Sequence, residues 1–270
     1  MAAAPDAPPD VRGRAVFAAA DVVYARGDWE GQRRMYDDAI ELLEQGGDEE
    51  HLLYALWARA VADSIAGHEV DVADRNARDA LARAEAEGYA EVAGRLNILL
   101  GTNAQERGDT DAARKHFERA AEKFDEPGDR YGRGVALENL AVAALFESDA
   151  NGAARALAES FDSWDYSQNL HNLGHALVVA AGIAEQHGEA VLATRLLGAV
   201  AATFERLGVL LQPSELRVER ATRELAQAAL GPARYEEELR RGAETELADV
   251  LAVVRQRLSR WAITPSPSAA

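Results

Sequence analysis

We expect an all-α fold: a right-handed superhelix of about five helix-turn-helix repeats, each about 40 residues long, closed by a C-terminal helical cap. Three observations favour it. Ala and Leu carry most of the 48% hydrophobic content while aromatic residues make up only 6%, a balance typical of closely packed helices rather than of a β-sandwich. Short turn signals recur at nearly even intervals, and apolar residues at helical spacing flank them.

The turn signals divide the chain into hairpins. They are centred on Gly27, Gly67, Gly108, Asp149 and Gly188, and successive positions are 39 to 41 residues apart. A glycine suits the left-handed residue that ends a helix, and an acidic residue beside it can cap the next helix. The spacing therefore predicts five hairpins over residues 11–207.

The apolar pattern is clearest around Gly108. Each flanking segment has four apolar residues on one helical face: Val92, Leu96, Leu99 and Leu100 before the turn, and Ala113, Phe117, Ala120 and Phe124 after it. A lone hairpin leaves an apolar face uncovered, so neighbours must stack on it, and the first helix of each pair should line a concave wall. Residues seven positions before each turn should lie where paired helices touch: Ala20, Ala60, Gly101, Val142 and Ala181.

The pattern changes after the fifth hairpin. Residues 207–213 form a break, a helix is expected from about Ser214 to Ala229, and Gly231-Pro232 interrupts again before one or two helices that end near Trp261. This predicts capping helices over residues 208–262. The Pro/Ala/Ser-rich ends, residues 1–10 and 263–270, are expected to be disordered tails.

Charge and composition restrict the partners. A net charge of -17 disfavours nucleic acid and anionic membranes. The absence of cysteine removes disulfides, thiolate nucleophiles and cysteine-ligated metals. The start of the chain has no signal-peptide pattern, so we expect a cytoplasmic protein. Lys115 and Lys123 are the only lysines among many arginines, which is typical of GC-rich bacteria.

Three stretches resemble tetratricopeptide-type repeats of the longer variety found in the C-terminal regions of large bacterial ATP-dependent transcription regulators of the LuxR-like and antibiotic-regulatory classes. Residues 128–141 (GDRYGRGVALENLA) are similar to the family's loop and first helix, and residues 108–114 (GDTDAAR) to its turn and second helix. Residues 195–199 (RLLGA) with 205–208 (ERLG) resemble its last repeat and cap.

The resemblance spans residues 11–254 and implies a surface for protein partners, small ligands or self-association. No phosphate-binding loop and no basic DNA-reading helix occurs, so the chain resembles the sensor and scaffold part of such a regulator without its ATPase and DNA-binding domains.

No catalytic motif is evident. His171 and His175 have the i, i+4 spacing of zinc ligands, but Asn172 stands where the metalloprotease motif needs Glu, and no third ligand lies nearby. We therefore expect groove-lining or packed histidines, no metal, no cofactor and no enzymatic activity.

The predicted function is a non-enzymatic scaffold or regulatory module that holds a protein or peptide on the concave face. Arg can pair with carboxylates and Asn with peptide amides, while aromatic rings supply contact area. The candidate concave-face residues are Arg14, Asp21, Tyr24, Tyr54, Trp57, Arg95, Thr102, Gln105, Glu138, Asn139, His171 and His175.

Alternatives stay open. The first helices can simply present an ordinary solvated face. In a small-molecule sensor or biosynthesis accessory protein, or an unusual enzyme, Tyr54, Trp57 and the two histidines would converge on a closed pocket. Homo-oligomer formation is open as well.

Overall fold

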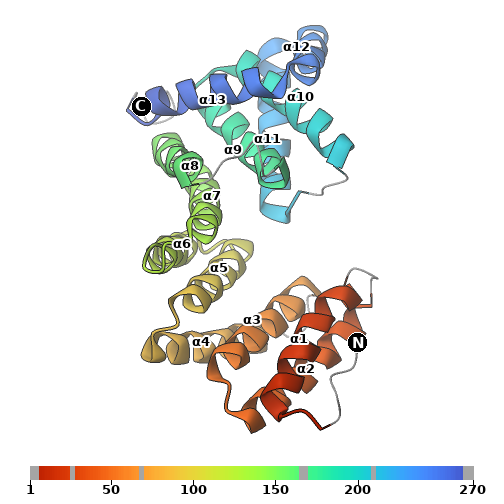
Figure 1. The fold of residues 1–270 in the computed structure, drawn as a ribbon. Coiled ribbons are helices and arrows are strands. Elements are labelled where there is room, and N and C mark those ends of the chain that lie inside the picture. The colour runs from red at the N-terminus through yellow and green to blue at the C-terminus, as the bar shows by residue number, and fades with distance from the viewer. Residues whose placement is uncertain (1–5, 25–27, 67–69, 164–169, 208–210, 264–270) are drawn as a thin grey trace.

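A computed structural model describes residues 6–24, 28–66, 70–163, 170–207 and 211–263, which form thirteen α-helices and no strand (Figure 1). The helices are α1 (Pro9–Tyr24), α2 (Trp29–Gly46), α3 (Glu49–Ala66), α4 (Val70–Glu87), α5 (Ala90–Glu106), α6 (Thr110–Asp125), α7 (Arg130–Phe146), α8 (Ala150–Ser163), α9 (Leu170–Gln186), α10 (Ala190–Leu207), α11 (Pro213–Leu230), α12 (Pro232–Glu244) and α13 (Leu247–Trp261). None of these helices is long and apolar enough to cross a membrane.

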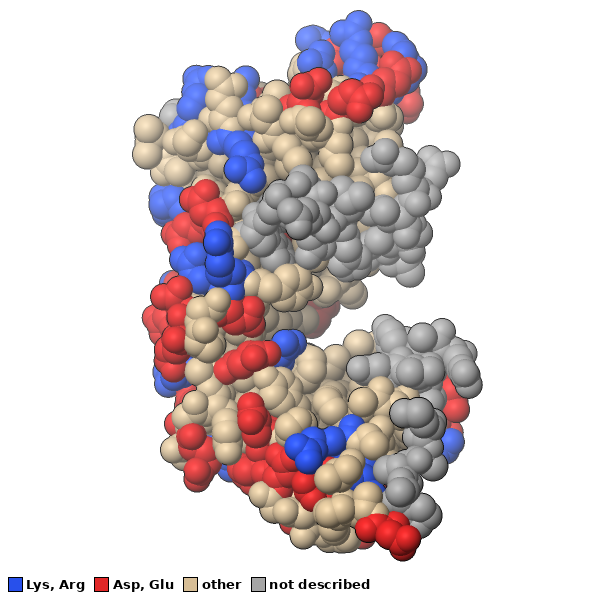
Figure 2. Space-filling view, viewed as in Figure 1, with Lys and Arg blue, Asp and Glu red and all other residues tan. Residues whose placement is uncertain are grey.

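The helices pack in a repeated pattern. Each odd-numbered helix from α1 to α9 packs antiparallel to the even-numbered helix that follows it, and that helix contacts the next odd one. Odd-numbered neighbours also contact each other: α3 with α5, α5 with α7, and α7 with α9. The stack curves, so that α1–α4 and α9–α13 stand at opposite ends of an open side (Figures 1 and 2).

The three described turns within hairpins, at residues 108, 148 and 188, each have a left-handed residue, as expected, but one of these residues lies elsewhere than predicted. Gly108 and Gly188 have φ of 78° and 74°, whereas the turn between them uses Ser148 at φ 60° and not Asp149. Asp149 instead caps α8, because its side chain accepts a hydrogen bond from the backbone N–H of Gly152 at 2.7 Å. The left-handed positions are thus forty residues apart on both sides of Ser148. Gly27 and Gly67 lie outside the described residues.

The corrected turn position changes the expected helix contacts. Seven residues before Ser148 stands Ala141, fully buried, rather than Val142. A Cβ atom on Gly101 would come within 2.6 Å of the Phe117 ring. The small residues at the corresponding positions of the five hairpins are all buried: Ala20, Ala60, Gly101, Ala141 and Ala181.

Helix α6 shows how apolar spacing becomes packing. Its buried residues are the four expected from the sequence: Ala113, Phe117, Ala120 and Phe124. The Phe124 ring fills the space left by Gly94 on α5 and Gly132 on α7, where a Cβ atom would clash with it. One ring therefore joins a hairpin to the next.

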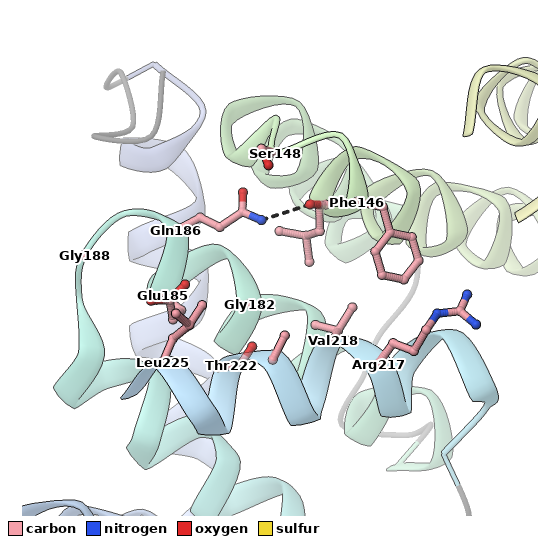
Figure 3. Close-up of a pocket in the computed structure, with 12 residues that line it drawn as sticks. Phe146, Ser148, Gly182, Glu185, Gln186, Gly188, Arg217, Val218, Thr222 and Leu225 are labelled. Carbon is pink, nitrogen blue, oxygen red and sulfur yellow. Dashed lines mark hydrogen bonds between the residues drawn. The ribbon is translucent and has the colours of Figure 1, made fainter. Parts of the chain in front are cut away.

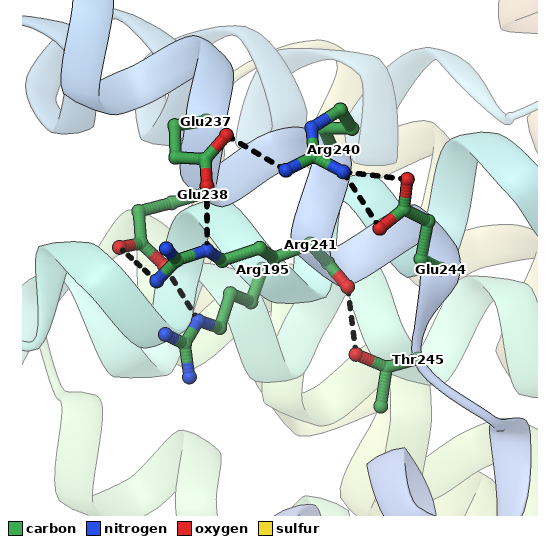
Figure 4. Close-up of polar contacts among 7 residues, drawn as sticks. All are labelled: Arg195, Glu237, Glu238, Arg240, Arg241, Glu244 and Thr245. Carbon is green, nitrogen blue, oxygen red and sulfur yellow. Dashed lines mark hydrogen bonds and ion pairs between the residues drawn. The ribbon is translucent and has the colours of Figure 1, made fainter.

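After α10, three helices close the stack. Helix α11 packs on α9 and α10, α12 on α10, and α13 on α8. Helices α10 and α12 approach through paired glycines, because a Cβ on Gly198 would clash with the Leu239 carbonyl and one on Gly242 with the Arg195 carbonyl. Arg195 Nε lies 2.7 Å from Glu238 Oε2 across this contact (Figure 4).

Candidate functional site

Helices α1, α2, α3 and α5 enclose a cleft of about 490 Å³. We name it the Arg95 cleft. Three of its residues, Tyr54, Trp57 and Arg95, were singled out from the sequence. Its lining comprises Phe17, Gln32, Tyr36, Tyr54, Trp57, Ala58, Val61, Ala62, Ile65 and Arg95.

Arg95 lies over two aromatic rings. Its Cζ atom is 5.8 Å from the ring centroid of Tyr54 and 5.3 Å from that of Trp57, within the usual range of a cation–π contact. Tyr54 and Trp57 are three residues apart on α3 and so share one helical face, while Arg95 reaches them from α5. Glu91 on α5 accepts a hydrogen bond from Arg95 Nη2 at 2.9 Å and fixes the guanidinium.

The protonation states of these groups follow from burial and from Glu91. Burial, then the negative charge of Glu91, raises the pKa of Tyr54 to about 12, so the phenol stays neutral. Burial acts to lower the pKa of Arg95, but the hydrogen bond and charge of Glu91 outweigh it and raise that pKa. At neutral pH the cleft thus presents a cation, a phenol and an indole.

The far wall of the cleft was not predicted. Gln32 Nε2 donates to the Tyr36 hydroxyl at 3.0 Å, and the Tyr36 ring lies 5.9 Å from that of Phe17. Gln32 and Tyr36 come from α2, the second helix of its hairpin, whereas the concave wall was expected mainly from the first helices. Their i, i+4 spacing is a local signal, but it indicates only a shared helical face. Ile65, 58% exposed, supplies an apolar rim.

Three candidates expected in the groove are buried instead. Gln105, Glu138 and His175 are only 3%, 7% and 6% exposed. The expectation was wrong because odd-numbered helices contact one another as well as their hairpin partners, which buries more of each helix than the hairpin alone would. Thr102 and Asn139 are half-buried, and Asn139 donates to the Val135 carbonyl of its own helix at 2.9 Å.

Arg14 does not line the Arg95 cleft. Arg14 is paired with Asp10 at 2.9 Å and with Asp48 at 3.6 Å. The side chains of Asp21, Tyr24 and His171 lie outside the described part of the structure.

His175 is buried, and its Nδ1 atom lies 2.6 Å from Glu215 Oε2, which ties α9 to the start of α11. Its ring also meets the edge of Phe204. The described residues contain no group of three or more His, Asp or Glu side chains that could hold a metal ion.

Helices α7, α9 and α11 enclose a second cleft, of about 540 Å³, which we name the Glu185 cleft (Figure 3). It shares no lining residue with the Arg95 cleft. The lining comprises Leu145, Phe146, Ser148, Gly182, Glu185, Gln186, Gly188, Arg217, Val218, Ala221, Thr222 and Leu225. None of the concave-face candidates whose side chains are described lies in it.

On the face shown in Figure 2, basic and acidic side chains interleave and no extended basic surface is visible. A comparison of the sequence with protein-family models and with curated proteins found no match. The geometry of the two clefts is therefore the basis for a functional assignment.

Proposed function

We propose that the protein is a non-enzymatic binding module, regulatory or scaffolding, whose stacked hairpins form a right-handed superhelix of the tetratricopeptide type. In this proposal a peptide segment of a protein partner lies along the odd-numbered helices. The repeated packing and the curvature of the stack support the proposal (Figure 1). A curved stack offers an extended concave surface, the part of such folds that holds peptides.

The observation that carries the proposal is the Arg95 guanidinium lying over Tyr54 and Trp57 in the Arg95 cleft. Arg, Tyr and Trp dominate binding energy at protein interfaces. A guanidinium has five N–H donors in a planar fork, more than the contact to Glu91 Oε1 uses. The cleft thus suits a peptide with an apolar or aromatic side chain beside a carboxylate or backbone carbonyl.

Selection from a peptide-display library on the purified protein tests this function. We expect enriched peptides with that pairing, and R95Q or W57L should weaken their binding by about tenfold or more, about 1.4 kcal/mol. The matched control is R119Q, because Arg119 pairs with Glu85 on the even-numbered helices, outside the cleft. Fluorescence anisotropy measures affinity, and circular dichroism verifies the fold.

Two results would contradict the proposal: a library that enriches no peptide, or selected peptides that bind R95Q and W57L as tightly as the unaltered protein. The second result would place the binding surface elsewhere on the molecule.

The Glu185 cleft favours a second candidate function, the sensing of a small molecule. Its volume of about 540 Å³ lies in the range of small-molecule sites. Purification from the native host followed by native mass spectrometry distinguishes the two functions, because a stoichiometric protein partner and a retained small molecule give different masses.

A further inference from the structure

Glu185 supplies the carboxyl group of the Glu185 cleft, and no ion pair to it is formed by the described residues. No described residue donates a hydrogen bond to this carboxyl or forms an ion pair with it. The side chain is half-buried, and burial raises the pKa of the carboxyl. A partly desolvated carboxylate without a partner is costly, and an entering cation would offset that cost.

Two helix C-termini meet at the same cleft. Helix α7 ends at Phe146 and α9 ends at Gln186, and both end residues line the cleft (Figure 3). A helix C-terminus carries a partial negative charge of about half a unit, which basic residues usually offset. Neither helix has a basic residue in its last turn.

The amide of Gln186 lies at the end of α9 and is fixed in place. Its Nε2 atom donates to the Leu145 carbonyl at 2.9 Å, so the amide is held in one orientation. Its Oε1 atom is buried with no hydrogen-bond partner. The helix ends and Glu185 favour positive charge in the cleft.

The nearby charged groups do not supply that positive charge. Arg217 lines the same cleft, with its Cζ atom 5.1 Å from the Phe146 ring centroid, but both carboxylate oxygens of Glu106 pair with it at 3.0 and 3.4 Å. Burial lowers the pKa of His187, which favours its neutral form. Glu189 is paired with Arg257 of α13 at 3.2 Å. The lining residues from α7, Leu145 and Phe146, carry no charge.

We propose that the Glu185 cleft binds a small organic cation, a protonated amine joined to an apolar body. The ammonium group pairs with Glu185 at the helix ends. The apolar body lies against Leu145, Val218 and Leu225, the last of which is 51% exposed. This site is independent of the peptide site, because the two clefts share no residue.

Isothermal titration calorimetry with three probes of similar shape tests the proposal: phenethylammonium, the neutral phenethyl alcohol and the anionic hydrocinnamate. We expect the ammonium ion to bind at least about tenfold more tightly than either analogue. Affinity should fall as the pH is lowered through the raised pKa of Glu185, because protonation of the carboxyl removes the charge that pairs with the amine.

Two pairs of variants locate the site. E185Q should weaken phenethylammonium binding about tenfold or more, while E224Q, which removes the same charge from an exposed position of α11 outside the cleft, should not. A221W should block the cleft with Glu185 intact, because Ala221 is an exposed lining residue. The control A228W adds the same bulk at an exposed residue that does not line the cleft.

The proposal is overturned if the alcohol binds as tightly as the ammonium ion, or if E185Q and A221W bind it as the unaltered protein does. It is also overturned if phenethylammonium, cyclohexylmethylammonium and tryptammonium all fail to bind.

Discussion

Arg217 on α11 forms a forked ion pair with Glu106 at the end of α5, with Nη1–Oε2 and Nη2–Oε1 distances of 3.0 and 3.4 Å. The two residues are 111 positions apart in the sequence. Their helices belong to the closing segment and to the third hairpin. The pair therefore links two distant parts of the stack through side chains rather than through a packed helix interface.

We expect R217Q to loosen this link with little loss of stability. The side chains are 44% and 40% exposed, and exposed pairs contribute about 0–1 kcal/mol. The chain has no cysteine, so spin labels at A86C and Q227C report one distance, whose distribution should broaden in R217Q. The control R220Q, an exposed arginine on the same helix, should leave it unchanged. Identical distributions in both variants would show that the pair does not hold the two parts.

Replacing Gln105 should stabilise the protein, whereas most substitutions in a protein core lower the free energy of unfolding. Its amide Nε2 and Oε1 atoms are both buried without a hydrogen-bond partner, and each such group costs about 1–3 kcal/mol. Replacement by methionine, of similar length, should therefore raise the free energy of unfolding by about 1–2 kcal/mol in urea titrations. Q45M, on an exposed glutamine that bonds Glu41, serves as control. A destabilised Q105M would mean that a bound molecule or solvent satisfies the amide.

Much of the fold could be predicted from the sequence because it depends on local chemistry. Even turn spacing and apolar faces determine where helices pair, and the four buried residues of α6 follow from their spacing alone. The turn at Ser148 was misplaced by one residue because a non-glycine in the left-handed region has no local sequence signal. Which surfaces of α5 and α7 are buried depends on neighbouring repeats, so Gln105 and Glu138 were misjudged.

The candidate sites were predicted in part for the same reason. Tyr54, Trp57 and Arg95 stand out as aromatic and basic residues on first helices, and they do lie together. Phe17 and Tyr36 are indistinguishable from core residues in the sequence. Glu185 is one of 46 acidic residues. Its lack of a partner follows from how α7, α9 and α11 meet, which no local pattern encodes.

His116 should make stability depend on pH. Its Nδ1 atom lies 2.9 Å from Asn97 Oδ1. Burial, then the charge of Arg78, lowers the pKa of the imidazole below its ordinary value. The unfolded chain then binds a proton at higher pH than the folded one. The contribution of neutral His116 to the free energy of unfolding is therefore fully present above about pH 6.5, and it is lost as the pH drops through the folded-state pKa.

H116Q should make the loss of stability at acidic pH smaller, because glutamine does not titrate and can still donate a hydrogen bond to Asn97. Urea titrations across the acidic range measure the slope, and NMR titration of the imidazole measures its pKa. H187Q should remove a separate part of the pH dependence of stability, because burial also lowers the pKa of His187. If the H116Q curve runs parallel to that of the unaltered protein, His116 does not carry this dependence.

The His175–Glu215 contact should be the most costly polar interaction to break. The two side chains are 7% and 12% exposed. Glu215 also accepts a hydrogen bond from the Gln212 backbone N–H at 2.9 Å, which caps α11. E215A removes the carboxylate oxygen that both donors share, so we expect a loss of about 2–4 kcal/mol in urea unfolding. E224A, at an exposed position of the same helix, should change stability by less than about 0.5 kcal/mol.

A double-mutant cycle separates the His175 contact from the helix cap. In H175F the ring volume is kept and the hydrogen bond is lost, so E215A should cost less in that background than in the unaltered protein. The cost of E215A in the unaltered protein minus its cost in H175F is the coupling energy between the two side chains, which we expect to be about 1 kcal/mol or more. The cost that E215A still has in H175F belongs to the helix cap. Additive effects would assign the whole cost to the start of α11. In that case the contact between His175 and Glu215 would not stabilise the packing of α9 on α11.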